Sequence, residues 1–331
     1  MQKYTILIVG GAGYIGSHMV KMLAKDGHRV IVLDNLSTGF AEAARFGEKL
    51  IVGDLADESL LDQLFTDYQF DAVMHFAAAS LVDESMENPA KYYRNNVNNT
   101  LNLLDAMVKH QVLNFVFSST AAIFGEPDYT PIDEGHPKNP INPYGASKLM
   151  IERMLEDYAA AYGLNSVSLR YFNACGADPE GELGERHDPE THLIPLLLQA
   201  ASGRRESISI FGTDYPTPDG TCVRDYIHVV DLCDAHLKGM GAMLSGQLNR
   251  ANAFNLGNGE GFTVREVIQS ASDVVAADDK QIKVLDESRR EGDPATLVAT
   301  SKLANAVLSW HPAHPTLQGM IADAWRWEKG S

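Results

Sequence analysis

The chain has 331 residues, of which 27 are lysine or arginine and 44 are aspartate or glutamate, so its formal net charge is −17. This excess of negative charge argues against a general binder of nucleic acid or of anionic membranes, and we expect neither as a partner. The 45% hydrophobic fraction, with 27 glycines and 14 prolines, is ordinary for a globular protein, excludes collagen, coiled coil and disorder, and at this length predicts about two domains.

Short apolar runs alternate with segments of helical period along the first half of the chain. The pattern predicts an α/β fold with a doubly wound parallel sheet of the Rossmann type. The last two expected helices begin at Asn88-Pro89 and Asn142-Pro143, each of which supplies a cap and a first-turn proline. The expected strands span residues 5–9, 30–33, 50–52, 72–75, 115–117 and 167–169, and the expected helices span residues 15–25, 59–65, 88–110 and 143–158.

The sequence pattern changes after Asn173, where a polar, glycine-rich segment is typical of a loop and cannot continue the sheet. We expect a first domain over residues 1–175 and a smaller mixed α/β domain over residues 176–331, some segments of which pack back on the first. The strands expected in the second half span residues 208–211, 253–256 and 282–284, and the helices span residues 193–201, 229–243, 264–276 and 315–327.

Cysteine usage and the chain ends bear on compartment and metal binding. Cys175, Cys222 and Cys233 are odd in number and lack a Cys-x-x-Cys spacing, which argues against a disulfide framework and a zinc knuckle. The apolar amino-terminal stretch is too short for a signal peptide, and no run approaches the ~18 apolar residues of a membrane span. We therefore expect a cytoplasmic protein with no metal site.

A glycine-rich turn follows the first expected strand. Its glycines, Gly10, Gly13 and Gly16, permit a tight turn and a close approach of the backbone to a pyrophosphate, and the following helix offers free N–H groups there. Asp34 ends the second strand, where a carboxylate accepts both hydroxyls of an adenosine ribose and repels a 2′-phosphate. The next residues, Asn35, Leu36 and Ser37, include no arginine, so the pattern predicts NAD rather than NADP.

The ends of the next strands are also small or polar. Asp54 and Leu55 follow the third strand, and Phe76, Ala77 and Ala78 follow the fourth, at the carboxyl edge where ligands bind such sheets. His75 is interpreted as a packed strand residue, because no second ligand stands at metal-binding spacing.

Tyr144 and Lys148 lie four residues apart in the first turns of a helix, so their side chains share one face. Thr120 ends the fifth strand, which brings a hydroxyl, a phenol and an ammonium together beside the nicotinamide. A free phenol has a pKa of about 10, and a neighbouring positive charge favours its phenolate. Tyr144 is therefore the candidate general base.

Over nearly its whole length the chain resembles the extended short-chain dehydrogenase/reductase family of NAD-dependent epimerases and dehydratases, and within it the nucleotide-sugar 4-epimerases. The matching segments include GGAGYIGSH at Gly10, FSSTAAIFG at Phe117, NPYGASKLMIE at Asn142, LRYFNACGADP at Leu169 and REGDPA at Arg290. Two departures are His192, where the family often carries Asn, and Ser80, where some members carry Lys.

The resemblance implies two sets of contacts. The residues implied on NAD are Tyr14, Ile15, Asp34, Asn35, Leu36, Ser37, Thr38, Gly39, Asp54, Leu55, Phe76, Ala77, Ala78, Ser80, Asn95, Thr120, Tyr144, Lys148 and Phe172. Those implied on a UDP-sugar are Thr120, Tyr144, Asn173, His192, Leu193, Ser209, Ile210, Phe211, Arg224, Arg290 and Asp293. Guanidinium groups pair bidentately with phosphate, so Arg224 and Arg290 are interpreted as diphosphate clamps; the alternative is a structural ion pair with Asp225 or Asp293.

The implied activity is the interconversion of UDP-galactose and UDP-glucose through a 4-keto sugar. Another nucleotide-sugar 4-epimerase, acting on UDP-N-acetylglucosamine or UDP-xylose, is an alternative. A 4,6-dehydratase or a decarboxylase generally places an acid after the strand-five threonine, where this chain has Ala121 and Ala122. A non-enzymatic NAD sensor would need only the glycine turn and Asp34.

Two further expectations come from the resemblance. Seven residues after the second diphosphate arginine, a bulky tyrosine in the family tends to exclude N-acetylated sugars; here that position is Leu297, which predicts weaker but measurable activity on UDP-N-acetylgalactosamine. The alternative interpretation is that Leu297 simply packs in a strand and has no role in substrate selection. The helices at residues 89–110 and 143–162 resemble those that pair in family homodimers, so we expect a homodimer.

Overall fold

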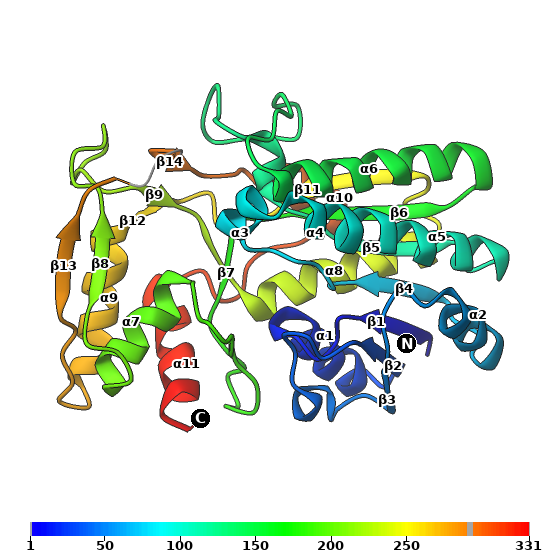
Figure 1. Cartoon of the computed structure of the whole chain (residues 1–331), viewed down its shortest axis with the longest axis horizontal. Helices are drawn as coiled ribbons and strands as arrows, with labels where there is room; N and C mark the ends of the chain where they lie inside the picture. Colours follow the sequence, from blue (N-terminus) through cyan, green and yellow to red (C-terminus); the bar gives the residue numbers. More distant parts are fainter. Residues whose placement is uncertain (1, 290–293, 331) are drawn as a thin grey trace.

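A parallel sheet forms the larger part of the molecule (Figure 1). The computed structural model describes residues 2–289 and 294–330, and within them this sheet has seven strands in the order β11-β6-β5-β4-β1-β2-β3, every neighbouring pair parallel. The strands are β1 (Thr5–Val9), β2 (Arg29–Asp34), β3 (Lys49–Val52), β4 (Ala72–His75), β5 (Asn114–Ser118), β6 (Asn165–Arg170) and β11 (Ala251–Asn255). The predicted doubly wound fold is confirmed.

Alternating side chains of the strands enter two different cores. In β1, Ile6 and Ile8 pack with one face of the sheet, and Leu7 and Val9 pack with the other. Because successive side chains of a strand point to opposite faces, an apolar run covered on both sides is the expected signature of this layer arrangement. Helices α1 (Tyr14–Lys25) and α8 (Val229–Leu244) cover the first face, and α2 (Glu58–Asp67), α5 (Asn99–Lys109) and α6 (Pro143–Tyr162) cover the second.

The helix expected over residues 88–110 is interrupted. Asn88 caps its start as predicted, accepting a hydrogen bond from the Lys91 N–H. The segment then runs as α4 (Pro89–Tyr92), a π-helical stretch η2 (Tyr93–Asn98) and α5. The π-helix carries Asn96, which is buried and hydrogen-bonded outside the helix. Periodicity alone does not reveal such a stretch, because a single wide turn hardly changes the apolar pattern.

Helix α6 begins and ends as its sequence indicates. The Asn142 side chain accepts a hydrogen bond from the Gly145 N–H at 2.8 Å, and Pro143 occupies the first turn. The helix stops at Gly163, whose φ of 76° is left-handed. The first two turns of α6 are therefore fixed at one end, close to where β5 ends.

A second layer of helices and short strands lies beside the main sheet (Figure 1). Its core is formed by apolar side chains of three helices and two strand pairs. The elements are β7 (Asn173–Cys175), α7 (Leu193–Ser202), β8 (Ile208–Phe211), β9 (Val223–Arg224), β10 (Tyr226–His228), β12 (Phe262–Thr263), α9 (Val264–Ala276), β13 (Val284–Glu287), β14 (Thr296–Leu297) and α11 (Leu317–Gly330). The remaining pieces are η1 (Ala41–Ala44), α3 (Val82–Glu87), η3 (Ala121–Phe124) and α10 (Lys302–Leu308).

Two strands of the second half differ from the sequence expectation. The strand expected at residues 253–256 is β11, which joins the main sheet beside β6 rather than the smaller layer. The strand expected at residues 282–284 is displaced to β13, because its parallel pairing with β8 starts at Val284 opposite Ile208. Later segments therefore do pack on the first domain, and the boundary at residue 175 stays a prediction.

Several local expectations can be compared directly. Cys175, Cys222 and Cys233 are free thiols and buried. His75 is packed in β4, with its Nε2 2.9 Å from Thr100 Oγ1. Among the helices of the described residues, none has the length and apolar character that crossing a bilayer requires.

Candidate active site

The predicted cofactor residues gather along one edge of the main sheet. Parallel strands end at the same edge, and β1 and β4, which connect in opposite directions, are neighbours in the sheet. Segments that leave the sheet here contain Gly10 after β1, Asp34 at the end of β2, Asp54 after β3, Phe76 after β4, Thr120 after β5 and Phe172 after β6. The structure thus brings together residues separated by more than 150 positions in the chain.

The glycine turn leaves no room for a side chain at Gly10 or at Gly16. A Cβ on Gly10, whose φ is 81°, would lie 2.5 Å from the Ala77 nitrogen, and one on Gly16 would lie 2.1 Å from the Gly10 oxygen. Gly13 caps α1 without a side chain, and the first turn of α1 contains no acidic residue. This helix end offers N–H groups and a positive dipole to an anion, so the turn fits the pyrophosphate of a dinucleotide.

Asp34 is held in place by the backbone around it. One carboxylate oxygen accepts from the Ala12 N–H at 2.9 Å, and the other accepts from the Leu36 N–H at 2.8 Å. A carboxylate has further lone pairs, which in this position can accept ribose hydroxyls. The residues present therefore fit NAD, and the predicted role of Asp34 stays a prediction.

Asparagines from neighbouring segments hold the loops after β3 and β4. The Asn35 and Asn99 side chains donate to Asp54 at 2.7 and 3.2 Å. Asn96 accepts from the Ala79 N–H and donates to the Ala79 carbonyl, which fixes the loop after β4. The sequence analysis named Asn95 as a cofactor contact and missed Asn96, because only the π-helical stretch turns this side chain into the core.

Thr120 and Lys148 are buried at the junction of β5 and α6, and Tyr144 beside them is half-buried. Burial raises the pKa of Tyr144, and a hydrogen bond with Thr120 offsets part of the rise. Lys148 donates to the Ser118 carbonyl at 2.9 Å and lies over the Phe117 ring. Hydroxyl, phenol and amine therefore stand on neighbouring elements, as predicted.

The electrostatics of this group differ from the expectation that Lys148 favours the Tyr144 phenolate. Burial lowers the pKa of Lys148 to about 7, and the negative charge of Glu152 offsets part of that shift. At neutral pH Lys148 is thus only partly charged, so desolvation dominates at Tyr144 and its pKa rises.

Glu152 belongs to a buried network that the sequence analysis did not identify. Its carboxylate accepts from the Ser119 hydroxyl at 2.7 Å and from the Arg170 guanidinium at 2.9 and 2.6 Å. Glu152 follows Lys148 by four residues on α6, so a third polar residue on one helix face was the available signal. The network ties α6 to the ends of β5 and β6.

The residues implied on the sugar nucleotide lie on the second layer. The Asn173 side chain donates to the Asp225 carbonyl at 3.0 Å, and Arg224 on β9 is half-buried. Leu297 on β14 pairs in register with Arg224, which agrees with its reading as a strand residue. Ser209, Ile210 and Phe211 form β8, and Leu193 begins α7. Arg290 and Asp293 lie outside the described residues.

His192 lies in a group of possible metal ligands, and the expectation that the protein has no metal site stays a prediction. Glu185, His187, Glu190 and His192 place their ligand atoms within 4.8 Å of one another. Burial opposes the His192 imidazolium, yet its ion pairs with Glu185 and Glu190 raise its pKa to about 10. The pattern Glu-x-His-x-x-Glu-x-His within eight residues was the signal, and the sequence analysis overlooked it by considering His75 alone.

Comparison with known proteins identifies the family. The profile of the NAD dependent epimerase/dehydratase family matches residues 6–257. The UDP-glucose 4-epimerase of Halalkalibacterium halodurans is 50% identical over 324 residues, which are 98% of this chain and 95% of that protein. A crystal structure of the UDP-glucose 4-epimerase of Brucella ovis in complex with NAD has a TM-score of 0.93 at 48% identity, covering 97% of each chain.

A further crystal structure, of the Bifidobacterium longum UDP-glucose 4-epimerase in complex with NAD⁺ and UDP, has a TM-score of 0.91 at 36% identity and covers 98% of each chain. These likenesses extend over both layers of the molecule. The chain therefore belongs to the NAD dependent epimerase/dehydratase family.

Proposed function

We propose that this protein is an NAD-dependent isomerase that interconverts UDP-galactose and UDP-glucose at carbon 4 of the sugar. The observation that carries the proposal is the meeting of Thr120, Tyr144 and Lys148 beside the glycine turn and Asp34. Relatives named UDP-glucose 4-epimerase at up to 50% identity, and neighbours solved with NAD or UDP, support it.

Tyr144 takes the proton from the sugar 4-hydroxyl, and Thr120 holds the reacting oxygen. Carbon 4 would give its hydride to bound NAD and would later receive it back, so the reaction has no net oxidation. The resulting 4-keto sugar turns about its link to the diphosphate and presents its other face. Tyr144 then returns the proton to the oxygen, which completes the inversion.

Lys148 and Glu152 support this proton transfer. Lys148 is anchored by the carbonyl of Ser118, which is the last residue of β5 and precedes Thr120 by two residues. We assign it to hold ribose hydroxyls of the cofactor and to supply positive charge near Tyr144. Glu152, paired with Arg170, keeps a negative charge one turn further along and favours the ammonium form of Lys148.

The second layer anchors the nucleotide so that only the sugar turns. Asn173, Leu193, His192 and strand β8 surround the proposed sugar-nucleotide position, and Arg224 meets the diphosphate. Arg290 and Asp293 are assigned by resemblance to the same group. With a net charge of −17, the protein needs such local cations to bind a diphosphate.

Leu297 is proposed as the gate for N-acetylated sugars. It is half-buried beside Arg224, smaller than tyrosine and without a hydroxyl. UDP-N-acetylgalactosamine is therefore proposed as a slower second substrate.

A dehydratase or decarboxylase is disfavoured by the residues after Thr120. Ala121 and Ala122 start η3, and the Ala122 N–H donates to Thr120 Oγ1. Neither side chain can donate or accept a proton, so this position cannot assist elimination. A sensor that only binds NAD would not explain the half-buried Tyr144 and the buried Lys148.

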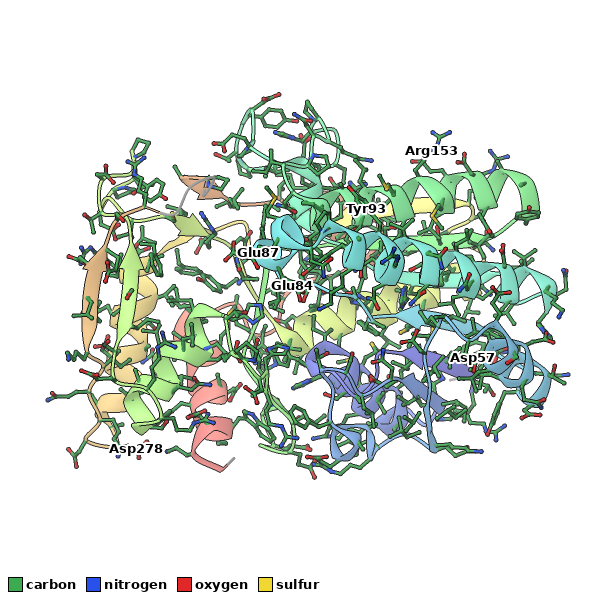
Figure 2. The ribbon with its side chains drawn as sticks, viewed as in Figure 1. Asp57, Glu84, Glu87, Tyr93, Arg153 and Asp278 are labelled. Carbon is green, nitrogen blue, oxygen red and sulfur yellow. The ribbon has the colours of Figure 1, made fainter. Side chains whose placement is uncertain are left out.

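A homodimer through the helices of the second face is part of the proposal. Large apolar side chains are exposed on adjoining elements there: Tyr93 on η2 is 39% exposed, Leu101 on α5 is 37% exposed and Met150 on α6 is 45% exposed. Figure 2 shows Tyr93 on this side, with Arg153 further along α6. A second copy of the same surface would bury these side chains, and a Met150→Glu variant that remains dimeric in light scattering would contradict this interface.

The test uses purified protein without added cofactor or metal. Incubation with UDP-galactose, UDP-N-acetylgalactosamine, UDP-xylose and a dTDP-sugar, followed by separation of products, identifies the substrate. We expect UDP-glucose from UDP-galactose, NAD rather than NADP in an acid extract, and turnover that survives a chelator. Cofactor extracted as NADP, or turnover abolished by the chelator, would overturn the proposal.

A further inference from the structure

Four acidic and imidazole side chains converge between β7 and α7. His192 Nδ1 lies 2.7 Å from Glu185 Oε1 and 3.3 Å from Glu190 Oε1. His187 Nδ1 lies 3.2 Å from Glu185 Oε1 and 3.6 Å from Glu190 Oε2. Each imidazole therefore directs the same ring nitrogen toward both carboxylates. We call these four residues the His/Glu cluster.

The spacing of these atoms matches the ligands of a tetrahedral cation. A divalent ion such as Zn²⁺ binds histidine nitrogen and carboxylate oxygen at ~2.0–2.2 Å. At such bond lengths, the ligand atoms of a tetrahedron stand ~3.3–3.5 Å apart. Glu185 Oε1 lies 2.7 and 3.2 Å from the two imidazole nitrogens, and Glu190 approaches His192 with Oε1 at 3.3 Å and His187 with Oε2 at 3.6 Å. These distances lie near that edge, and binding through one Glu190 oxygen requires a small rotation of its carboxylate.

Burial disfavours the imidazolium form, yet the two carboxylates raise the pKa of His187 to about 9 and that of His192 to about 10. The protonated cluster is therefore neutral, and a divalent cation would replace its two imidazolium protons. The Glu185 and Glu190 side chains are only 6% and 4% exposed. In the described part of the chain, neither pairs with a lysine or an arginine, and their ion pairs are with the two imidazoles. His187 Nδ1 is buried, and none of its contacts qualifies as a hydrogen bond. Buried carboxylates facing such a nitrogen form the type of polar environment that a metal satisfies.

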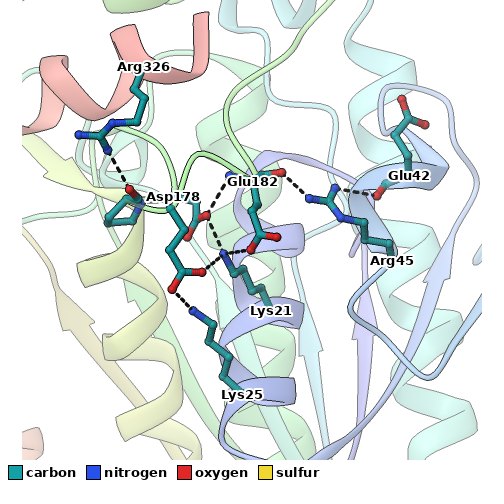
Figure 3. Close-up of polar contacts among 9 residues, drawn as sticks. Lys21, Lys25, Glu42, Arg45, Asp178, Glu182 and Arg326 are labelled. Atoms are coloured by element: carbon teal, nitrogen blue, oxygen red, sulfur yellow. Dashed lines mark hydrogen bonds and ion pairs between the residues drawn. The ribbon is translucent and has the colours of Figure 1, made fainter. Parts of the chain in front are cut away.

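The segment that carries the cluster is held at its amino-terminal side by two anchors. Figure 3 shows Lys21 of α1 against the acidic residues of this loop, with ion pairs to Asp178, Glu180 and Glu182 at 2.6, 2.8 and 2.6 Å. The Trp327 indole donates to the Glu185 carbonyl at 3.0 Å. A loop held in this way keeps its ligands close together, which reduces the ordering cost of binding.

We propose that the His/Glu cluster binds one divalent transition cation of the Zn²⁺ type, with His187 and His192 as nitrogen ligands and Glu185 and Glu190 as oxygen ligands. The site is separate from the hydride and proton transfers of the proposed function, because no reacting atom is placed on it. The cation would join the loop after β7 to the start of α7. The His187 ring also packs edge-on against Tyr14 in the first turn of α1, so the cluster lies next to the glycine turn that is proposed to bind the cofactor.

The test is a titration of the full-length, chelator-treated protein with Zn²⁺ by calorimetry and with Co²⁺ by absorption. We expect one tight equivalent, an intense visible Co²⁺ spectrum of the tetrahedral kind, and a higher melting temperature with Zn²⁺. His187→Gln and, independently, Glu185→Gln should weaken binding by more than about 100-fold, beyond the ~10–100-fold typical of residues that only support a ligand.

A second His/Asp group in the chain supplies the matched control. His228, His314 and Asp323 also place ligand atoms near one another. His314→Gln should leave the Zn²⁺ affinity unchanged. Micromolar Zn²⁺ that fails to bind, binding that survives both His187→Gln and Glu185→Gln, or binding lost through His314→Gln would each overturn the proposal. Turnover of UDP-galactose is recorded separately, so inactive protein that still binds Zn²⁺ counts against the proposed function and not against this site.

Discussion

Replacing Tyr144 with phenylalanine removes the proposed base while leaving the ring that fills its place. Tyr144 is half-buried, and its ring contacts Tyr92 edge-on with centroids 6.4 Å apart. Phenylalanine keeps this contact and loses only the hydroxyl and its hydrogen bond with Thr120. The substitution therefore separates the chemical role of the oxygen from the packing of the ring.

The two expected effects differ greatly in size. Loss of one hydrogen bond lowers the free energy of unfolding by ~0.5–1.5 kcal/mol. Loss of a general base raises the activation barrier much more, because such groups contribute ~10²–10⁴ in rate, or ~2.7–5.4 kcal/mol. Tyr144→Phe should thus lower kcat at least about 100-fold in a fold that is nearly as stable as before.

The assay measures UDP-galactose conversion, extracted NAD and chemical denaturation on the same preparation. Tyr92→Phe is the matched control, since this neighbouring tyrosine is fully buried and bonds Leu81 and Glu84 rather than the site. It should keep kcat within a few-fold. Near-normal kcat in Tyr144→Phe would show that another group is the base, and equal losses in both variants would assign the effect to packing.

Three other substitutions test the cofactor and sugar contacts. Lys148→Met should lower turnover and NAD affinity yet stabilise the fold, because folded Lys148 has a pKa of about 7 against an ordinary 10.5, and each unit costs the charged form ~1.4 kcal/mol. This gain in the free energy of unfolding should be largest below pH 7. It should vanish as the pH rises toward 10.5, where the lysine of the unfolded chain also loses its proton. Chemical denaturation across that pH range measures the gain, and a variant less stable than the parent protein at pH 6 would contradict the burial argument. Asp34→Ala should weaken NAD binding ~10–100-fold in calorimetry, because the ribose loses its hydrogen bonds to the carboxylate and the Ala12 N–H loses its acceptor. An unchanged affinity would show that Asp34 does not contact the cofactor. Leu297→Tyr should suppress conversion of UDP-N-acetylgalactosamine and spare UDP-galactose; equal loss of both, or of neither, would show that this side chain is not the gate.

The parts of the fold that the sequence predicted depend on short-range patterns. Strand β1 was found because an apolar run covered on both faces is followed by glycines that only a tight turn explains. Helix α6 was found because Asn142 and Pro143 mark its start independently of its apolar face. Such signals arise within a few residues, so they survive without knowledge of the tertiary structure.

The parts that were missed depend on contacts between distant segments. Glu152 accepts hydrogen bonds from Arg170 and Ser119, and these residues come within reach only once β5, β6 and α6 are packed together. Strand β11 has the sequence ANAFN, with two asparagines among alanine and phenylalanine, and nothing in it indicates that it joins β6 rather than the second layer. The lowered pKa of Lys148 likewise requires knowing how completely it is buried.

The raised pKa of Tyr144 suits a base that must return its proton. In an epimerisation the same oxygen is deprotonated and then reprotonated, so a phenolate that is too stable would hinder the second half of the reaction. Burial keeps the neutral phenol favoured, and Thr120 offsets only part of that preference. Lys148, whose pKa lies near neutrality, and Glu152, which supports its charge, can then stabilise the phenolate for the short time that the keto sugar exists. The balance between these buried groups therefore serves both directions of proton transfer, and strengthening the positive charge beside Tyr144 would speed deprotonation at the expense of its reversal.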